Sequence, residues 1–235
     1  MTDKSVILGR PAGRNTAGKS PVSRNSDGKS PAAGPPHGNL SEEEIVAAAL
    51  RVVHEDGLDK LSMRRLSREL GVSAMAPYYY VSDKRELLDL VATAALAGIA
   101  APDRDGDWQT RLRTLIDQID DRLARYPGLG EVLLEQMLRT QRHLVEMVME
   151  ILFDAGFSER NVLVAYGAIH TYLFGRSGIA NQEPSIPDRS TLPEVIARAV
   201  RHLDKVHARD FYRFGAETLI SGLGVQLDRQ RSVSL

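Results

Sequence analysis

From Leu40 onward, apolar residues recur at the spacing of one helix face, and almost no segment alternates as a half-buried strand does. The first such face, at positions i, i+3, i+4, i+7 and i+8, consists of Ile45, Ala48, Ala49, Val52 and Val53. Ser41 and Glu44 precede it at the spacing of a capping box, and Gly57 follows it as a stop signal. The pattern predicts an amphipathic helix of about three to four turns.

Three further helices are predicted directly after it, with Ser62, Ser73 and Ser82 at their N-cap positions; the first two are short and the third is long. Gly71 ends the first of them, and the second covers about 74–80. Two short helices joined by a turn that contains glycine have the proportions of a helix-turn-helix, whose second helix enters the major groove of DNA.

The rest of the chain continues the helical pattern without a strand signal. Further helices are predicted over about 108–126, 129–138, 139–155, 159–179, from 191 onward and over 210–227. The helix over 159–179 is apolar nearly all round, so we expect it to be buried on more than one side. The predicted fold class is all-α, with an N-terminal helix-turn-helix domain and a larger helical domain.

Composition divides the chain into three parts. Residues 1–39 are rich in Gly, Pro, Ser and Asn and hold almost no large apolar side chain after Leu8, which predicts a disordered arm. The arm carries a charge of +4 and the other 196 residues carry −5, which suggests a tail that visits an anionic partner, with a plain solubilising or linker tail as the alternative. The helical parts are predicted to divide into domains at 40–100 and 101–235.

The absence of cysteine excludes disulfide scaffolds, thiol nucleophiles and Cys-ligated zinc. The longest apolar stretch, from Leu90 to Ala101, is shorter than the roughly 20 residues of a membrane-spanning helix. No apolar block follows the start of the chain as in a secretory signal. We therefore expect a soluble, cytoplasmic protein without a membrane partner.

Residues 13–20 match the phosphate-loop pattern G-x-x-x-x-G-K-[ST]. Such a loop needs a buried strand before it and a helix after it, whereas Pro21 follows directly and no apolar strand precedes it. The histidines lack the spacing of a metal site, and no serine lies in a nucleophile context. We expect no cofactor, metal or catalytic residue, and a nucleotide hydrolase using 13–20 stays a weak alternative.

Positive charge gathers around the predicted helix-turn-helix, where residues 60–85 carry +4. Tyr78, Tyr79 and Tyr80 follow one another at steps of about 100° around a helix, so at least one of these side chains faces solvent or a partner. Tyrosine hydroxyl groups commonly contact DNA phosphates. Both observations favour a local DNA-binding surface on a chain whose net charge is only −1.

The stretch from Leu61 to Leu88, LSMRRLSRELGVSAMAPYYYVSDKRELL, resembles the DNA-binding domain of the TetR/AcrR family of bacterial transcriptional regulators, with the tetracycline-repressor branch as the nearest group. The resemblance covers about 60 residues, including the Glu-Asp-Gly-Leu exit at 55–58. It implies a ligand-responsive regulator, most simply a repressor that binds a palindromic operator as a homodimer and is released by a small-molecule effector.

The same resemblance assigns roles to individual residues. Those implied to contact DNA are Ser62, Arg64, Ala74, Met75, Ala76, Tyr78, Tyr79, Tyr80 and Lys84. The residues on helices that surround the effector cavity in the family are Met137, His143, Met147, Tyr166, His170 and Phe174. Helices near 159–180 and 209–228 are implied to form the dimer interface.

Pro77 departs from the family pattern, in which a buried leucine usually stands at this position. Proline lacks the N–H that would bond to Ser73, so we expect the recognition helix to be kinked or shifted. This departure leaves open a second alternative, a helical ligand-binding or scaffold protein without a DNA role.

Overall fold

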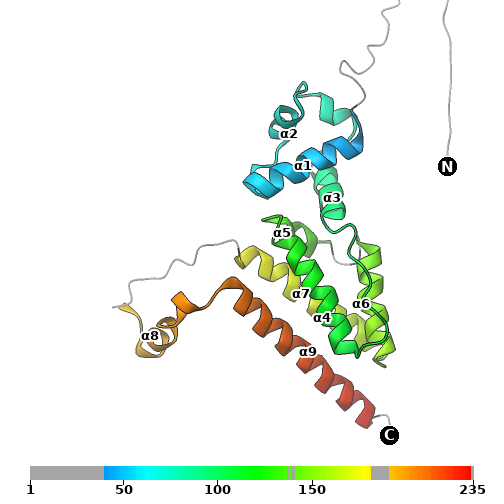
Figure 1. Cartoon of the computed structure of the whole chain (residues 1–235), viewed down its shortest axis with the longest axis vertical. Helices are drawn as coiled ribbons and strands as arrows, with labels where there is room; N and C mark the ends of the chain where they lie inside the picture. The colour runs from blue at the N-terminus through cyan, green and yellow to red at the C-terminus, as the bar shows by residue number, and fades with distance from the viewer. Residues whose placement is uncertain (1–39, 137, 139–140, 181–190, 234–235) are drawn as a thin grey trace, which may run out of the picture. The chain divides into compact units, whose positions relative to one another are not determined.

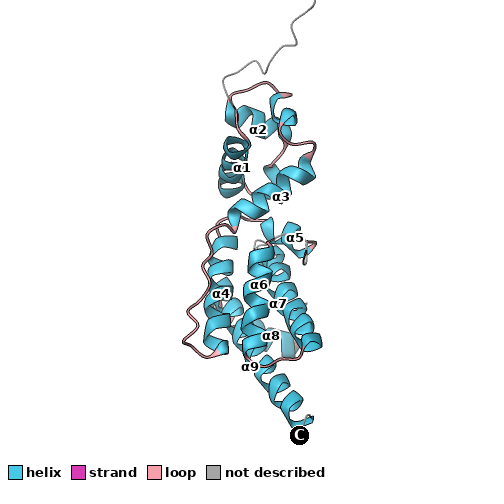
Figure 2. Ribbon diagram, turned by 90° about the vertical axis from the view of Figure 1, so that its right-hand side faces the viewer, coloured by secondary structure: helices cyan, strands magenta, loops and turns pink. Residues whose placement is uncertain are grey.

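The computed structural model describes residues 40–136, 138, 141–180 and 191–233. Within these ranges every regular element is a helix, as the sequence predicts (Figures 1 and 2). The α-helices are α1 (Glu42–Asp56), α2 (Met63–Leu70), α3 (Lys84–Ala95), α4 (Trp108–Leu123), α5 (Leu129–Leu134), α6 (Arg142–Asp154), α7 (Glu159–Ala180), α8 (Glu194–Val200) and α9 (Ala208–Val233). The short 3-10 helices are η1 (Leu58–Lys60), η2 (Ala76–Tyr79) and η4 (Leu203–Lys205).

Helix α1 forms as its capping residues predict. The N–H of Glu44 donates to Ser41 Oγ at 3.1 Å, and the N–H of Ser41 donates to Glu44 Oε2 at 2.8 Å. The predicted apolar face, including Ile45 and Val52, is completely buried, and α1 packs against α2 and α3. Helix α1 is therefore the base on which the two neighbouring helices are fixed.

The predicted helix over 74–80 is replaced by a turn followed by the four-residue 3-10 helix η2. Pro77 explains the difference, because it has no N–H with which to continue an α-helix from Ser73. Its carbonyl instead accepts the N–H of Tyr80 at 3.0 Å. Met75, and not Ser73, stands at the N-cap position, and no side chain caps the element.

The next helix begins one residue later than the serine cap predicts. Asp83 is the N-cap of α3, and its carboxylate accepts the N–H of Glu86 at 2.9 Å. Ser82 instead donates its backbone N–H to the Glu86 carboxylate at 2.6 Å. The hydrogen bonds from Ser82, its backbone N–H first, lower the pKa of Glu86.

The second group of helices begins at α4, where Asp107 accepts the N–H of Thr110 at 2.9 Å, as predicted for a cap. Two boundaries differ from the prediction. Helix α5 ends at Leu134 instead of continuing to 138, and α9 extends beyond the predicted 210–227 at both ends. Leu138 has a φ of 64°, outside the α-helical region.

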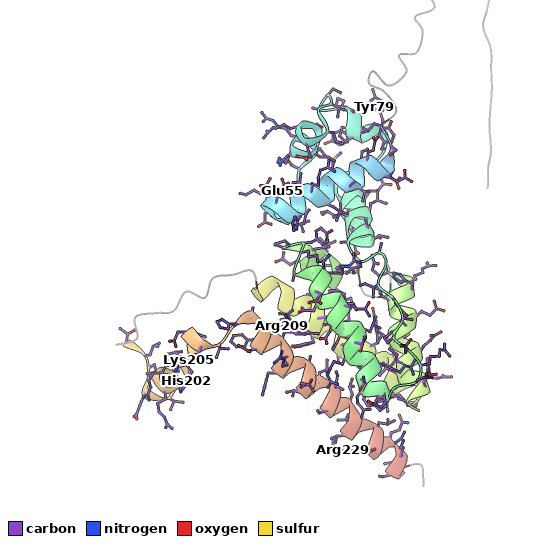
Figure 3. All side chains as sticks on the ribbon, in the orientation of Figure 1. Glu55, Tyr79, His202, Lys205, Arg209 and Arg229 are labelled. Carbon is purple, nitrogen blue, oxygen red and sulfur yellow. The ribbon has the colours of Figure 1, made fainter. Side chains whose placement is uncertain are left out.

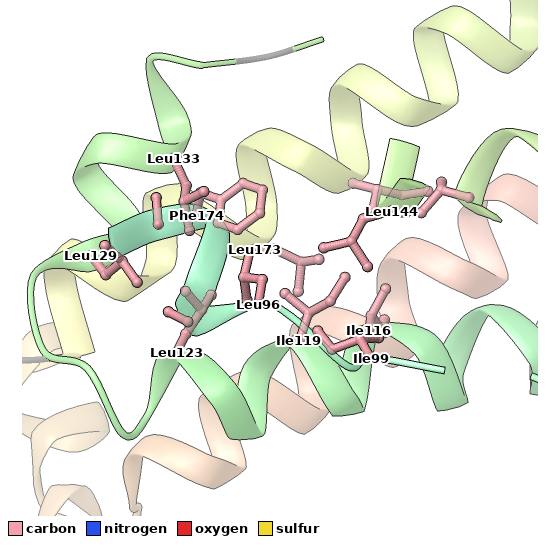
Figure 4. Packing of buried hydrophobic residues seen from close by; sticks show 14 of the residues in the cluster. Leu96, Ile99, Ile116, Ile119, Leu123, Leu129, Leu133, Leu144, Leu173 and Phe174 are labelled. Atoms are coloured by element: carbon pink, nitrogen blue, oxygen red, sulfur yellow. The ribbon is translucent and has the colours of Figure 1, made fainter. Parts of the chain in front are cut away.

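Helices α1 to α3 form the first group of helices, and it is joined to the second group, which begins at α4, through buried contacts. Leu96, at the C-cap of α3, is completely buried, and Figure 4 shows it among side chains from α4, α5 and α7. On the other side, the N–H of Leu58 donates to the carbonyl of Pro127 at 3.0 Å. Gly128 lies there with a φ of 87°, and an added Cβ would lie 2.8 Å from Leu58 Cβ. The connection between the two groups is thus packed on both sides.

Candidate nucleic-acid interface and ligand cavity

The turn between α2 and η2 is built by its end residues. Ser62 caps α2 by accepting the N–H of Arg65 at 3.2 Å. Gly71 ends the helix in the left-handed conformation with a φ of 67°, and the N–H of Val72 donates to Ser67 at 3.0 Å. These bonds direct the chain away from α2 and into the short segment that carries the predicted contact residues.

That segment exposes side chains that normally lie inside proteins. Met75 is 64% exposed, Tyr79 is 73% exposed and Tyr78 is 45% exposed. Figure 3 marks Tyr79 on the surface of the first helical group. Tyr80 is half-buried and packs against the core. Two aromatic rings and a thioether are therefore available to a partner.

One of the predicted contact residues is not exposed. Ala76 is buried, with only 8% of its surface exposed, so its methyl group is not available to a base. Pro77 beside it is buried as well, where the family pattern has a buried leucine. The 3-10 turn points both side chains inward, whereas Ala74 before them is exposed.

The basic side chains of α2 fall into two classes. Arg65 is committed to its own fold, since its guanidinium pairs with Glu69 at 2.8 Å and with Asp56 at 3.1 Å. Arg51 also pairs with Glu69, at 3.2 Å. The hydrogen bond to Glu69 raises the pKa of Arg65, and the bonds from Arg65 and Arg51 lower the pKa of Glu69.

Arg64 and Arg68 form the second class, together with Lys84 of α3. All three are exposed, and none has an ion-pair partner within the part of the chain that the structure describes. Lys84 is the first residue of α3, where the helix dipole adds to its positive charge. Uncompensated cations on α2 and α3, the helices before and after the segment with Met75 and Tyr79, give these elements the chemistry of a phosphate-binding surface.

A second candidate site lies among α4, α5, α6 and α7, where the described residues leave a cavity of about 40 Å³. Its lining consists of Ile119, Leu133, Gln136, Gln141, Leu144, Val145, Val148, Tyr166, Ile169, His170, Leu173 and Phe174. Figure 4 shows several of these residues in the core of the second group. The cavity is therefore an internal feature of this core and is lined mostly by apolar side chains.

Three of the predicted cavity residues line it, namely Tyr166, His170 and Phe174. Two do not: His143 is exposed on α6, and Met147 is half-buried outside the lining. Met137 lies outside the described residues. The residues predicted on α6 lie one position before Leu144 and Val148, which line the cavity.

His170 is held in one form by its surroundings. Its Nε2 lies 3.1 Å from the carbonyl of Leu134, which only accepts, so Nε2 carries the proton. The hydroxyl of Tyr166 lies 3.4 Å from Nδ1. Burial lowers the pKa of His170 and raises the pKa of Tyr166, so both side chains are neutral near pH 7.

Two glutamines of the cavity are absent from the prediction. Gln136 donates from Nε2 to Asp89 Oδ1, which links the cavity wall to α3. Gln141 has a left-handed backbone with a φ of 59°, and both atoms of its side-chain amide are buried without a hydrogen-bond partner among the described residues. Both glutamines lie within predicted helices, over 129–138 and 139–155, and helical periodicity alone does not mark either of them as a cavity residue.

Arg176 of α7 has a structural role. It pairs with Asp120, and its guanidinium carbon lies 4.8 Å from the ring centroid of Tyr212. The hydroxyl of Tyr212 donates to Asp117. Burial, and then the Asp117 bond, raises the pKa of Tyr212. The network ties α7 to α4 and α9, and Arg176 is not among the residues that line the cavity.

Comparison with known proteins identifies this arrangement. The profile of the bacterial regulatory proteins of the tetR family matches residues 45–91, and the profile of the tetracyclin repressor-like C-terminal domain matches residues 101–227. The chain belongs to the tetR family. As a family member it is a ligand-responsive, DNA-binding transcriptional repressor, and the family consists of transcription regulators and not of enzymes.

Individual relatives agree with this assignment. The tetracycline repressor protein class D of Escherichia coli is 30% identical over 199 residues, which cover 80% of this chain and 91% of that protein. The Streptomyces coelicolor TetR-family protein ActR in complex with (S)-DNPA has a TM-score of 0.65, 22% identity, and coverage of 83% and 100%. BioQ with its double-stranded DNA operator has a TM-score of 0.59, 24% identity, and coverage of 79% and 98%.

For membrane spans, metal sites and the phosphate-loop pattern, the structure gives information only about the described residues. No helix within the described ranges is long and apolar enough to cross a membrane. In the same ranges, no three His, Cys, Asp or Glu side chains are grouped as a metal site would require. The phosphate-loop pattern at 13–20 and the remainder of the 1–39 arm lie outside the described residues.

Proposed function

We propose that this TetR-family chain binds a palindromic DNA operator as a homodimer and is released by a small molecule that enters the α4–α7 cavity. The observation that carries the DNA part is the exposure of Met75 and Tyr79 on the segment between α2 and α3, the two helices that carry the unpaired cations. Exposed apolar and aromatic side chains can contact base edges, while the cations can contact phosphates.

The proposed contacts divide by chemistry. Ser62, Tyr79 and Lys84 contact phosphates, which fixes the protein on the duplex. Arg64 and Met75 face base edges from the major groove, together with Ala74, whose small side chain fits against a thymine methyl group. Tyr78 and Tyr80 also contact the DNA. Tyr80 does so only with the part of its side chain that is not packed against the core. The solved BioQ–operator complex, similar in fold, supports this use of the surface.

We propose that two copies associate through α7 and α9. Both helices expose apolar side chains, with Leu163 51% and Val164 58% exposed on α7 and Phe214 77% exposed on α9. The two helices are fixed to each other within the chain, because the Tyr172 hydroxyl donates to the Tyr212 carbonyl at 2.7 Å. A twofold pair gives two copies of η2, as reading a palindrome requires.

One hydrogen bond connects the wall of the cavity to the helices that carry the proposed DNA contacts. Gln136 lines the cavity and bonds to Asp89 on α3, whose N-terminus carries Lys84. A ligand that moves Gln136 therefore changes the support of α3. Release of the operator then follows as a shift between two conformers, for which a few kcal/mol of differential ligand affinity is sufficient.

A salt titration of binding to the DNA upstream of the chain's own gene tests the proposal. Phosphate contacts predict a steep fall of affinity with rising salt. The basic arm also contributes to that slope, so the matched comparison is the full chain against the Tyr79→Ala/Lys84→Ala double variant, which keeps the arm. We expect the double variant to show a shallower slope; equal slopes would assign DNA binding to the arm and favour the scaffold alternative.

A further inference from the structure

The lining of the cavity has no formal charge. None of its twelve described residues is Asp, Glu, Lys or Arg, and its one histidine is kept neutral by burial, while its Nε2–H donates to the Leu134 carbonyl and its Nδ1 faces the Tyr166 hydroxyl. Arg176 is paired with Asp120, and Asp89 accepts a hydrogen bond from Gln136, but none of these three charged groups belongs to the lining. A charged ligand would have to leave water without gaining a counter-charge, which is strongly unfavourable.

One wall of the cavity is aromatic. Tyr166, His170 and Phe174 follow one another at i, i+4 and i+8 on α7. The ring centroids of Tyr166 and His170 are 5.7 Å apart, and those of His170 and Phe174 are 4.7 Å apart. The facing wall is aliphatic and includes Leu144 and Val148 of α6. A flat ring between these walls gains contact on both faces.

The amide of Gln141 is the one cavity group described that has both a donor and an acceptor left over. Its Nε2 and Oε1 are buried, and neither has a protein partner in the described part of the chain. The cavity of about 40 Å³ has room for about one or two water molecules. A ring-sized ligand must displace solvent and move lining side chains, and it gains affinity only if it replaces the bonds that solvent makes to the amide.

We propose that the effector is an uncharged, mainly aromatic molecule that carries an acceptor and a donor side by side and binds them to the Gln141 amide. This inference rests on the proposed function, because it defines the ligand of the same cavity. The acceptor of the ligand takes the Nε2–H of Gln141 and its donor bonds to Oε1, while the ring lies along the Tyr166–His170–Phe174 wall.

Three probes that share one ring system test the proposal by calorimetric titration of the full chain. 2-Naphthamide is neutral and carries both a donor and an acceptor, 2-naphthoate is an anion, and 2-methylnaphthalene has neither hydrogen-bonding group. We expect the amide to bind about tenfold more tightly than each of the others, the effect of pairing otherwise unsatisfied groups. In Gln141→Leu this preference over 2-methylnaphthalene disappears, and in Gln141→Asn, which keeps an amide and tolerates the left-handed backbone, much of it returns.

His143→Leu is the matched control, since His143 is exposed on the same helix and does not line the cavity. Equal or tighter binding of 2-naphthoate, an unchanged amide preference in Gln141→Leu, or no binding of any probe up to its solubility would each overturn the proposal. Operator binding is measured on the same samples. A chain that binds DNA without preferring the amide refutes this inference alone, whereas a chain that does not bind DNA refutes the proposed function.

Discussion

The proposed DNA-binding surface on α2 and η2 and the cavity among α4, α5, α6 and α7 both contain aromatic side chains. These side chains are exposed on the surface and buried in the cavity. Tyr79 is 73% exposed on η2, whereas Phe174 on α7 is 8% exposed. A buried ring stabilises the fold through the apolar area it removes from water. An exposed ring contributes little to the stability of the fold, so its apolar area can still be buried against a partner.

Charge follows the same division. Arg64 and Lys84 stand unpaired among the described residues on the first surface, while the described lining of the cavity contains no Asp, Glu, Lys or Arg. Arg65, on the same helix as Arg64, is an intermediate case, because its charge is paired with Glu69 within the chain. A surface for a polyanion keeps its cations free, and a cavity that closes around a ligand excludes them.

Truncating one ring in each region gives the largest expected contrast. Phe174→Ala should lower the free energy of unfolding by about 3–5 kcal/mol, because it opens a buried cavity. Tyr79→Ala should change it by less than about 0.5 kcal/mol, as is usual for a surface substitution. Urea denaturation of both variants measures the difference. Similar losses would mean that η2 is sealed against the core in solution and that the comparison fails.

Variants of the first surface should divide further by type of contact. Tyr79→Ala and Lys84→Ala should weaken binding by about tenfold on every DNA sequence, because phosphate contacts carry no sequence information. Met75→Ala and Arg64→Ala should mainly reduce the preference for the operator. Affinities for operator and scrambled duplexes at one salt concentration check both statements. The reverse pattern would mean that the proposed docking is displaced along η2.

The sequence predicts those features of the fold that depend on a few neighbouring residues. Ser41 with Glu44, Ser62 and Asp107 cap the helices that they were expected to cap. The prediction is wrong where two local signals compete. Ser82 and Asp83 both suit an N-cap, and only the contact with Glu86 selects Asp83.

In the candidate sites too, the sequence predicts features that depend on neighbouring residues and fails for contacts between residues far apart in the chain. The exposed side chains of η2 follow from one short motif, although the inward turn of Ala76 depends on how Pro77 changes the helix type. Tyr166, His170 and Phe174 are found because they share one helix face. The bond from Gln136 to Asp89 joins residues 47 positions apart, and helical periodicity contains no information about such a pair.

The Gln136–Asp89 bond gives a smaller and more specific test of how the two regions are connected. Gln136→Leu should speed amide hydrogen exchange in α3 by about fivefold, because it removes one hydrogen bond worth roughly 1 kcal/mol. Asp89→Leu should have the same effect, and the double variant should add little to either.

The matched control is Gln118→Leu, since Gln118 bonds to Ala100 and not to α3. It should speed exchange near residue 100 and leave α3 unchanged. Additive effects of Gln136→Leu and Asp89→Leu, measured by exchange with mass spectrometry, would show that the pair does not act as a link.

The smallest expected effect is the pH dependence of stability that His170 contributes. Burial places its folded-state pKa below the ordinary value of 6.5, so the unfolded chain binds a proton that the folded chain does not. This contribution to stability is therefore present above pH 6.5 and is lost as the pH falls below it, with a slope of at most about 1.4 kcal/mol per pH unit. Unfolding by urea between pH 5 and pH 8 should show a weaker pH dependence in His170→Gln, which keeps a donor for the Leu134 carbonyl, and no change in His143→Gln. Parallel curves for the wild-type chain and His170→Gln would mean that the wall of the cavity accepts a charge, and with it a charged effector.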